Sequence, residues 1–453
     1  MNLRLSFAGI AAVAVFAGPA AAADLGGNCC ADLEERIAEL EATTARKGNR
    51  KVSLMVYGQV NEAVLFWDDG VEKNITVATN DNSRTRFGFK GEAKINADLK
   101  AGYVLEIGVR ANNSKRFNQD QNTAALADRG LDVRHSRWFI GSKTFGTVSV
   151  GTTPTAMEAI TEINQAHTKD IAKFSDVEDS GLGLLLRGTN GDLSAVQWRR
   201  LIKQSGDQPG EGERRQGIWY VSPEFGGFSV ESGWGADDHW DIGMRYKGDL
   251  AGFKVAAGGA YGESTDEDFE GAFFECVSSS KSNATPGTSR ASCSQYGGSL
   301  SVMHETTGLY FNLAGGVHED DNVLRDSDIA GTGASNESKF WAVEAGIEQK
   351  FNSLGKTTLF GQYYDLDGGA NARLTVAGTD AINSGIGDAN IFSTGLQMTG
   401  GGIVQELSAA GMNLYLYYRH YEGDATLVND GIVSKSANFE DLDVVVGGAI
   451  IKF

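Results

Sequence analysis

The sequence predicts an all-β fold, a closed antiparallel transmembrane β-barrel of about 16 strands, and three observations carry this prediction. Apolar and polar residues alternate over segments of about twelve residues, longer than the five or six usual in globular strands. Tight turns alternate with long polar connections along the chain. Beyond the N-terminal apolar stretch, no run approaches the roughly 20 apolar residues that a membrane-spanning helix needs.

The first residues have the organisation of a secretory signal peptide. Arg4 gives the start a positive charge, an apolar stretch runs from Phe7 to Ala17, and alanines at 20–23 offer an A-x-A cleavage site. We expect a signal peptide over residues 1–22, with a cut after Ala23 as a close alternative.

Residues 31–47 favour a short helix. Leu33, Ile37, Leu40 and Thr44 recur with coiled-coil spacing. Two heptads are too short to be stable alone, so two interpretations stay open. The segment is a helix that oligomerises beside a larger assembly, or it is a frayed linker.

Strand alternation begins at Lys51, and we expect the barrel over residues 51–453. The predicted strands are 52–61, 84–95, 99–110, 134–143, 147–152, 215–221, 228–234, 240–247, 253–261, 297–305, 309–318, 340–350, 356–365, 390–399, 412–420 and 442–453. Residues 181–203 are ambiguous: they form an extra hairpin, which would favour 18 strands, or part of a folded-in loop.

The lipid environment of the strands requires the sheet to close into a barrel. In hydrocarbon every backbone amide must be paired, and an open edge would leave donors and acceptors unsatisfied. A barrel of about 16 to 18 strands encloses water, whereas about eight strands would be filled by side chains. The strand number therefore predicts a pore.

Composition excludes several other functions. The net charge is −19, spread over the chain, which disfavours a nucleic-acid partner because phosphates require a basic face. No G-x-S-x-G, H-E-x-x-H or P-loop motif is present, so we expect neither an enzyme nor a cofactor.

The four cysteines fall in two pairs. Cys276 and Cys293 flank a Ser-rich segment, for which a loop disulfide is favoured over a metal site. The adjacent Cys29 and Cys30 either bridge subunits or remain thiols. Neither pair has zinc-finger spacing, and we predict no metal site.

Several motifs coincide with those of a known family. Residues 83–91 (SRTRFGFKG), 136–141 (SRWFIG), 145–151 (FGTVSVG), 220–228 (YVSPEFGGF) and 409–415 (AAGMNLY), with the terminal Phe453, resemble the general diffusion porins of Gram-negative outer membranes, alphaproteobacterial branch. The resemblance covers residues 51–453. It implies a multi-pass barrel in the cell outer membrane, among its lipid and lipopolysaccharide, assembled as a homotrimer.

The resemblance also implies an inward loop opposed by a basic wall. Arg86, Arg137 and, less closely, Arg215 match the wall arginines, and strand alternation places Lys90 and Arg110 on the same wet face as Arg86. The loop would span about 152–180. It carries the acids Glu158, Glu162, Asp170, Asp176, Glu178 and Asp179, of which we select Glu158, Glu162 and Asp170 as constriction acids.

Both ends of the exported chain have an implied role. In barrel families a C-terminal aromatic is read by the assembly machinery, so the resemblance implies that role for Phe453, which also fits an aromatic-girdle position. A mature end beginning Ala23-Asp24 resembles the amino terminus by which some alphaproteobacterial barrels are joined to peptidoglycan. Residues 23–50 would then be a periplasmic spacer.

The favoured function is passive diffusion of small hydrophilic solutes and ions through a water-filled channel. A substrate-selective channel built on the same barrel is the second hypothesis. A secreted soluble β-protein, such as an adhesin or sugar-binding module, is the third, and the long apolar faces of the strands disfavour it.

Overall fold

The computed structural model describes residues 51–120, 130–202, 208–235, 239–264, 293–321, 323–325, 329–376, 389–429, 432–433 and 437–453. The predicted helix at 31–47, the Ala23-Asp24 end, Cys29, Cys30 and Cys276 lie outside these residues. Within them, no helix is long and apolar enough to span a membrane.

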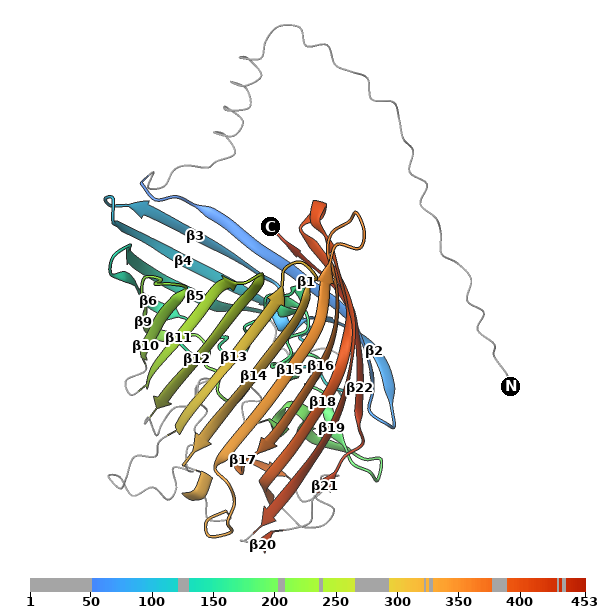
Figure 1. The fold of residues 1–453 in the computed structure, drawn as a ribbon. Coiled ribbons are helices and arrows are strands. Elements are labelled where there is room, and N and C mark those ends of the chain that lie inside the picture. Colours follow the sequence, from blue (N-terminus) through green and yellow to red (C-terminus); the bar gives the residue numbers. More distant parts are fainter. Residues whose placement is uncertain are drawn as a thin grey trace, which may run out of the picture. The chain divides into compact units, whose positions relative to one another are not determined.

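Sixteen strands form one closed antiparallel ring in the described part of the chain, which confirms the predicted fold (Figure 1). Each strand pairs with the next, and the last strand pairs with the first over Gln59–Asp68 and Asp443–Lys452. The ring strands are β1 (Met55–Asp68), β3 (Arg86–Lys94), β4 (Leu99–Arg110), β5 (Gly130–Ser142), β6 (Gly146–Thr153), β9 (Arg215–Val221), β10 (Phe228–Gly235), β11 (His239–Leu250), β12 (Phe253–Ser264), β13 (Cys293–His304), β14 (Leu309–Asp320), β15 (Glu337–Gln349), β16 (Thr357–Gly368), β18 (Ala389–Leu407), β19 (Met412–Asn429) and β22 (Leu442–Lys452).

Shorter strands extend the ring at one rim. β2 (Lys73–Thr79) pairs with the second half of β1, β17 (Asn371–Val376) pairs with β18, and β20 (Ile432–Val433) and β21 (Ala437–Asn438) pair with β19. The ambiguous segment 181–203 adds no ring strand. It contains a separate hairpin of β7 (Leu185–Arg187) and β8 (Leu193–Gln197).

Six short 3-10 helices in the described part of the chain are less important for the architecture. They are η1 (Asp81–Ser83), η3 (His167–Asp170), η4 (Val177–Asp179), η5 (Trp198–Leu201), η6 (Val323–Arg325) and η7 (Ser408–Ala410). Of these, η3, η4 and η5 belong to the connection between β6 and β9, which positions the site described below.

The two rims differ, as the turn pattern predicts. Short turns such as 95–98, 143–145 and 251–252 lie at the upper end of the barrel in Figure 1, and the longer connections lie at the lower end. In outer-membrane barrels the short turns are periplasmic and the long loops extracellular.

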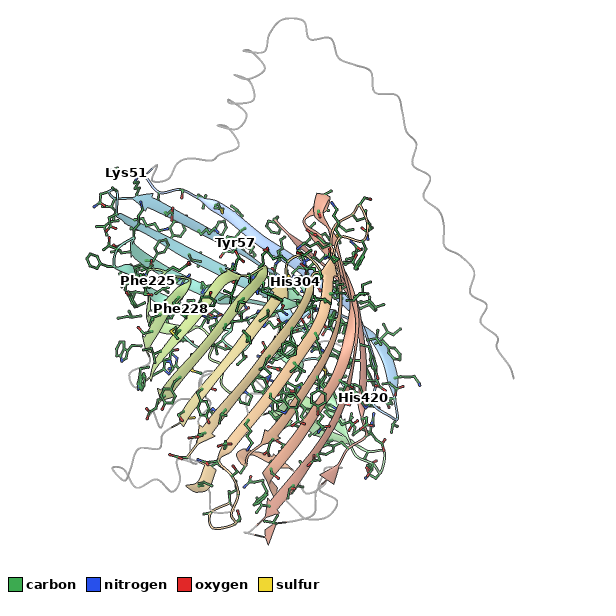
Figure 2. The ribbon with its side chains drawn as sticks, viewed as in Figure 1. Lys51, Tyr57, Phe225, Phe228, His304 and His420 are labelled. Atoms are coloured by element: carbon green, nitrogen blue, oxygen red, sulfur yellow. The ribbon has the colours of Figure 1, made fainter. Side chains whose placement is uncertain are left out.

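Alternation along the strands separates a lipid face from a lumen face. On β14, for example, Leu309, Phe311 and Leu313 are exposed, whereas Tyr310 and Asn312 between them are buried. Aromatic residues flank the apolar band: Figure 2 shows Phe225, Phe228 and His304 toward the short-turn end of the barrel. The ring centres of Phe228 and Tyr246 are 4.7 Å apart. Aromatic residues near the ends of the strands are typical of the interfacial girdles of outer-membrane barrels.

A hydrophobic core lies inside the ring, on one side of the lumen. It joins inward residues of β1, β14–β16, β18, β19 and β22 to the connection between β6 and β9. From the wall come Leu65, Trp67, Tyr364, Met398, Tyr417 and Val444, and from the connection Ile171, Phe174, Leu182, Leu184, Trp198 and Leu201. The barrel is therefore partly filled by its own chain.

Candidate functional site: a charged constriction in the lumen

The segment that follows β6 lies inside the barrel. Its described residues are 154–202 and 208–214, so it continues beyond residue 180, where the sequence led us to expect its end. The physical reason is the core just described, because the apolar residues of 181–202 pack against the wall and so belong to the same inward segment. We call residues 154–214 the inner segment.

Polar contacts fix the inner segment to the far wall. The buried carboxylate of Glu344 on β15 accepts hydrogen bonds from Thr168 Oγ1 at 2.7 Å, Asn164 Nδ2 at 3.1 Å and Gln362 Nε2 at 2.6 Å. Arg419 of β19 donates to Ser180 Oγ at 2.9 Å. Such bonds to charged groups are stronger than neutral ones, so the segment is held in one position.

A cavity of about 500 Å³ remains between the inner segment and the opposite wall. Among the described residues, eleven Lys and Arg and nine Asp and Glu line it. The basic residues are Arg84, Arg86, Arg110, Lys115, Arg116, Arg134, Lys169, Lys173, Arg199, Arg200 and Arg214. The acids are Asp81, Glu158, Glu162, Asp170, Asp176, Glu178, Asp179, Glu211 and Glu213.

Four arginines form the wall side of the cavity, and we call them the wall quartet: Arg84, Arg86, Arg110 and Arg134. They share two carboxylates. Asp132 accepts from Arg84 Nη2 at 2.8 Å and lies 3.3 Å from Arg110 Nη2. Glu106 accepts from Arg134 Nε at 2.7 Å and lies 3.8 Å from Arg86 Nε.

A β-bulge brings Arg134 into the quartet. In the pairing of β4 with β5, Ile107 faces Val133 but Glu106 faces His135, so Arg134 is the extra residue. A bulge re-aims a side chain that strict alternation would place on the other face. Gly108 accommodates the result, because a Cβ there would come within 2.5 Å of Asp132 Oδ1.

The acids selected from the sequence all line the cavity on the inner-segment side. Glu158 is paired with Arg214, and Asp170 is paired with Lys452. Burial raises the pKa of each carboxyl, but the neighbouring cations outweigh it, and both pKa values lie below the usual range. Arg86 is among the cations that lower the pKa of Asp170.

Glu162 belongs to a cluster around Lys173. Lys173 Nζ donates to Glu162 Oε1 and Asp176 Oδ2, both at 2.8 Å. Burial and then Glu162 raise the pKa of Asp176 to about 7. Burial, Glu162 and Asp176 likewise raise the pKa of Glu211. Oxygens of the three acids lie within 4.8 Å of one another, a spacing that could hold a metal ion, but Lys173 already contacts two of them.

The structure does not bring all the predicted wall residues to this cavity. Among described lining residues, Arg86 and Arg110 are present, and Lys90, Arg137 and Arg215 are not. Lys90 Nζ lies 5.3 Å from the ring centre of Tyr57, and the Arg137 guanidinium lies 4.9 Å from that of Trp219. Arg215 is buried at the start of β9.

Sequence reasoning missed Arg84, Arg134 and Arg214. Arg84 lies within the predicted strand 84–95 on the same face as Arg86, but is not among the wall residues selected, and Arg214 directly precedes β9. A bulge shifts the face of Arg134, and the sequence carries no signal of it. Lys115, Arg116, Arg199 and Arg200 come from connections that strand patterns do not describe.

Two predicted features outside the cavity can also be located. Cys293 is disulfide-bonded, while its expected partner Cys276 lies outside the described residues. The backbone of Phe453 exchanges two hydrogen bonds of 3.0 Å with Gly58, so the last residue closes the ladder with β1.

A closed ring of this size, with apolar side chains outside and a charged cavity inside, defines a pore-forming barrel of the bacterial outer membrane. The chain belongs to the Gram-negative porin family, whose model matches residues 9–436. It is an outer-membrane porin, and its class of function is passive diffusion through a channel. Fold and family point to a channel rather than an enzyme.

Solved structures similar to this chain are outer-membrane proteins. One is OmpT of Vibrio cholerae, with 14% sequence identity, coverage of 90% of this chain and 99% of that one, and a TM-score of 0.47. Another is an anion-selective porin from Comamonas acidovorans, with 15% identity, coverage of 89% of this chain and 100% of that one, and a TM-score of 0.49. A third is the outer membrane channel DcaP of Acinetobacter baumannii, with 11% identity, coverage of 90% of this chain and 99% of that one, and a TM-score of 0.46. The comparison with curated protein sequences finds no match.

Proposed function

We propose that the inner segment is the constriction of a general diffusion channel, and that it sorts small hydrophilic solutes by size and polarity. The observation that carries this proposal is the 500 Å³ cavity between the wall quartet and the acids of the inner segment. Opposite charges on facing sides create a transverse field, which favours hydrated, dipolar solutes over apolar ones of equal size.

Liposome swelling tests the proposal. Liposomes containing the protein should admit small sugars at rates that fall with solute size, without saturation. The matched variant is Glu344→Ala, which removes the anchor of the inner segment and should raise the size cutoff. Liposomes that stay as impermeable as bare lipid would overturn the proposal. Uptake that saturates with one solute would instead favour the substrate-selective channel.

We further propose that the porin works as a homotrimer surrounded by lipid and lipopolysaccharide. The support is the exposed apolar face, which needs either lipid or another barrel as its partner. A trimer should migrate on gels as one large species that heating converts to the monomer. A single heat-independent monomer band would count against it.

The N-terminal expectations remain proposals of the same kind. A signal peptide over residues 1–22 would leave Ala23-Asp24 as the end joined to peptidoglycan, with 23–50 as the spacer. Sacculi stripped with detergent and then digested should yield this peptide attached to a muropeptide. Recovery of the peptide only in free form would remove the idea.

A further inference from the structure

The wall quartet carries more positive charge than its neighbouring carboxylates neutralise. Its four guanidinium groups share the two carboxylates Glu106 and Asp132. In the described part of the chain, Nε of Arg84 and Nε of Arg110 are buried without a hydrogen-bond partner. Because two guanidinium groups share each carboxylate, the quartet keeps an excess of positive charge toward the cavity, and an oxygen-bearing anion that enters would be stabilised there.

The inner-segment side offsets only part of this excess. Three of its acids are themselves paired with cations: Glu158 with Arg214 and Glu162 with Lys173 of the inner segment, and Asp170 with Lys452 of β22. Each pair offsets part of the negative charge that faces the quartet.

Charges of both signs lie in the layer behind the cavity. Glu106 and Asp132 stand behind the quartet and Glu344 behind the inner segment, while Lys452 and Arg419 contact the inner segment with positive charge. Arg419 meets the inner segment through Ser180 Oγ and the Val177 carbonyl. The described lining itself has eleven basic and nine acidic side chains, although the whole chain carries −19.

We propose that the channel conducts anions in preference to cations, and that the wall quartet transiently binds the carboxylate or phosphate group of passing solutes. The inference rests on the proposed diffusion function and names the solute class of the same constriction. Arginine suits the task because its planar fork matches both oxyanions in a bidentate manner.

Single-channel recording under a potassium chloride gradient tests the preference. The reversal potential of the wild-type protein should have the sign of chloride selectivity. Absence of any conductance would overturn the diffusion function, whereas conductance with potassium selectivity would overturn this inference alone. Because the wild-type measurement needs no variant, poor folding of a mutant cannot obscure it.

Arg84→Gln tests the assignment to the quartet. Arg84 precedes β3 and donates no ladder bond within it, so the barrel should tolerate the change. Removal of one unit charge about 6 Å from the ion path in water should lower the chloride-to-potassium permeability ratio about two- to threefold. Lys339→Gln is the control, because Lys339 is half exposed on the outer face of β15 and should leave the ratio unchanged. An Arg84→Gln ratio equal to wild type would contradict the assignment.

Inhibition by inorganic phosphate tests whether the quartet binds an oxyanion, separately from the effect of its positive charge on ion selectivity. Added to one side, phosphate should reduce chloride current through the wild-type channel at lower concentrations than through Arg84→Lys, which keeps the charge and loses the guanidinium fork. Equal inhibition of the two proteins would overturn the oxyanion site.

Discussion

Arg134 illustrates how one residue can change the character of a pore. Strict alternation through β5 would place its side chain in lipid, and the bulge opposite Glu106 and Ile107 turns it into the lumen. There it completes the wall quartet by donating to Glu106. A charge on the lipid face would cost about 2–4 kcal/mol at the bilayer midplane, so the bulge also relieves the barrel of that cost.

Asp176 should make ion selectivity depend on pH. Its pKa is raised to about 7 by burial and Glu162, and Lys173, Asp179 and Glu211 of the inner segment also face it, with Tyr364 from β16. The carboxyl is ionised at pH 8 and mostly protonated at pH 6, so lowering the pH adds one positive charge to the balance.

The chloride-to-potassium permeability ratio should therefore rise from pH 8 to pH 6. Asp176→Asn should have the higher ratio at both values and a smaller step between them. Reversal potentials measured at the two pH values check this. A wild-type ratio that falls on acidification would contradict it.

At the scale of elements, the position of the inner segment depends strongly on one buried carboxylate, that of Glu344. Glu344→Ala leaves Thr168 Oγ1, Asn164 Nδ2 and Gln362 Nε2 without this acceptor. The loss of buried partners costs about 1–3 kcal/mol each. Limited proteolysis should cut residues 154–214 faster in Glu344→Ala than in wild type. Glu337→Ala, on the outer face of the same strand, should leave the rate unchanged.

The sixteen ring strands could be predicted from the sequence because alternation is a local property and persists along each of them. The part of the inner segment beyond residue 180 could not, because the apolar residues of 181–202 do not follow a sustained period of two. Their packing partners, such as Tyr364 and Val444, lie far away in the sequence. Likewise, alternation assigns Arg84, Arg86 and Arg110 to the wet face, whereas Arg134 depends on a bulge and Arg214 on a strand end.

At the scale of the whole molecule, the outer surface should respond to charge according to depth in the membrane. Leu313 lies in the middle of β14 and Leu309 at its first residue, and both face outward. Leu313→Arg should destabilise the folded barrel by about 2–4 kcal/mol and Leu309→Arg by about 0–1 kcal/mol. Denaturant titrations of protein folded into vesicles measure both, and equal losses would argue against this placement in the bilayer.

The seam between β22 and β1 has a consequence for chain connectivity. The last strand ends and the first begins at the same rim, beside each other, since Phe453 is bonded to Gly58. Because Phe453 pairs with Gly58, six residues from Val52, a peptide linking Phe453 to Val52 must span about 20 Å, which takes about six extended residues. New termini could then be opened in an external loop, and a circularly permuted gene should still encode the same pore.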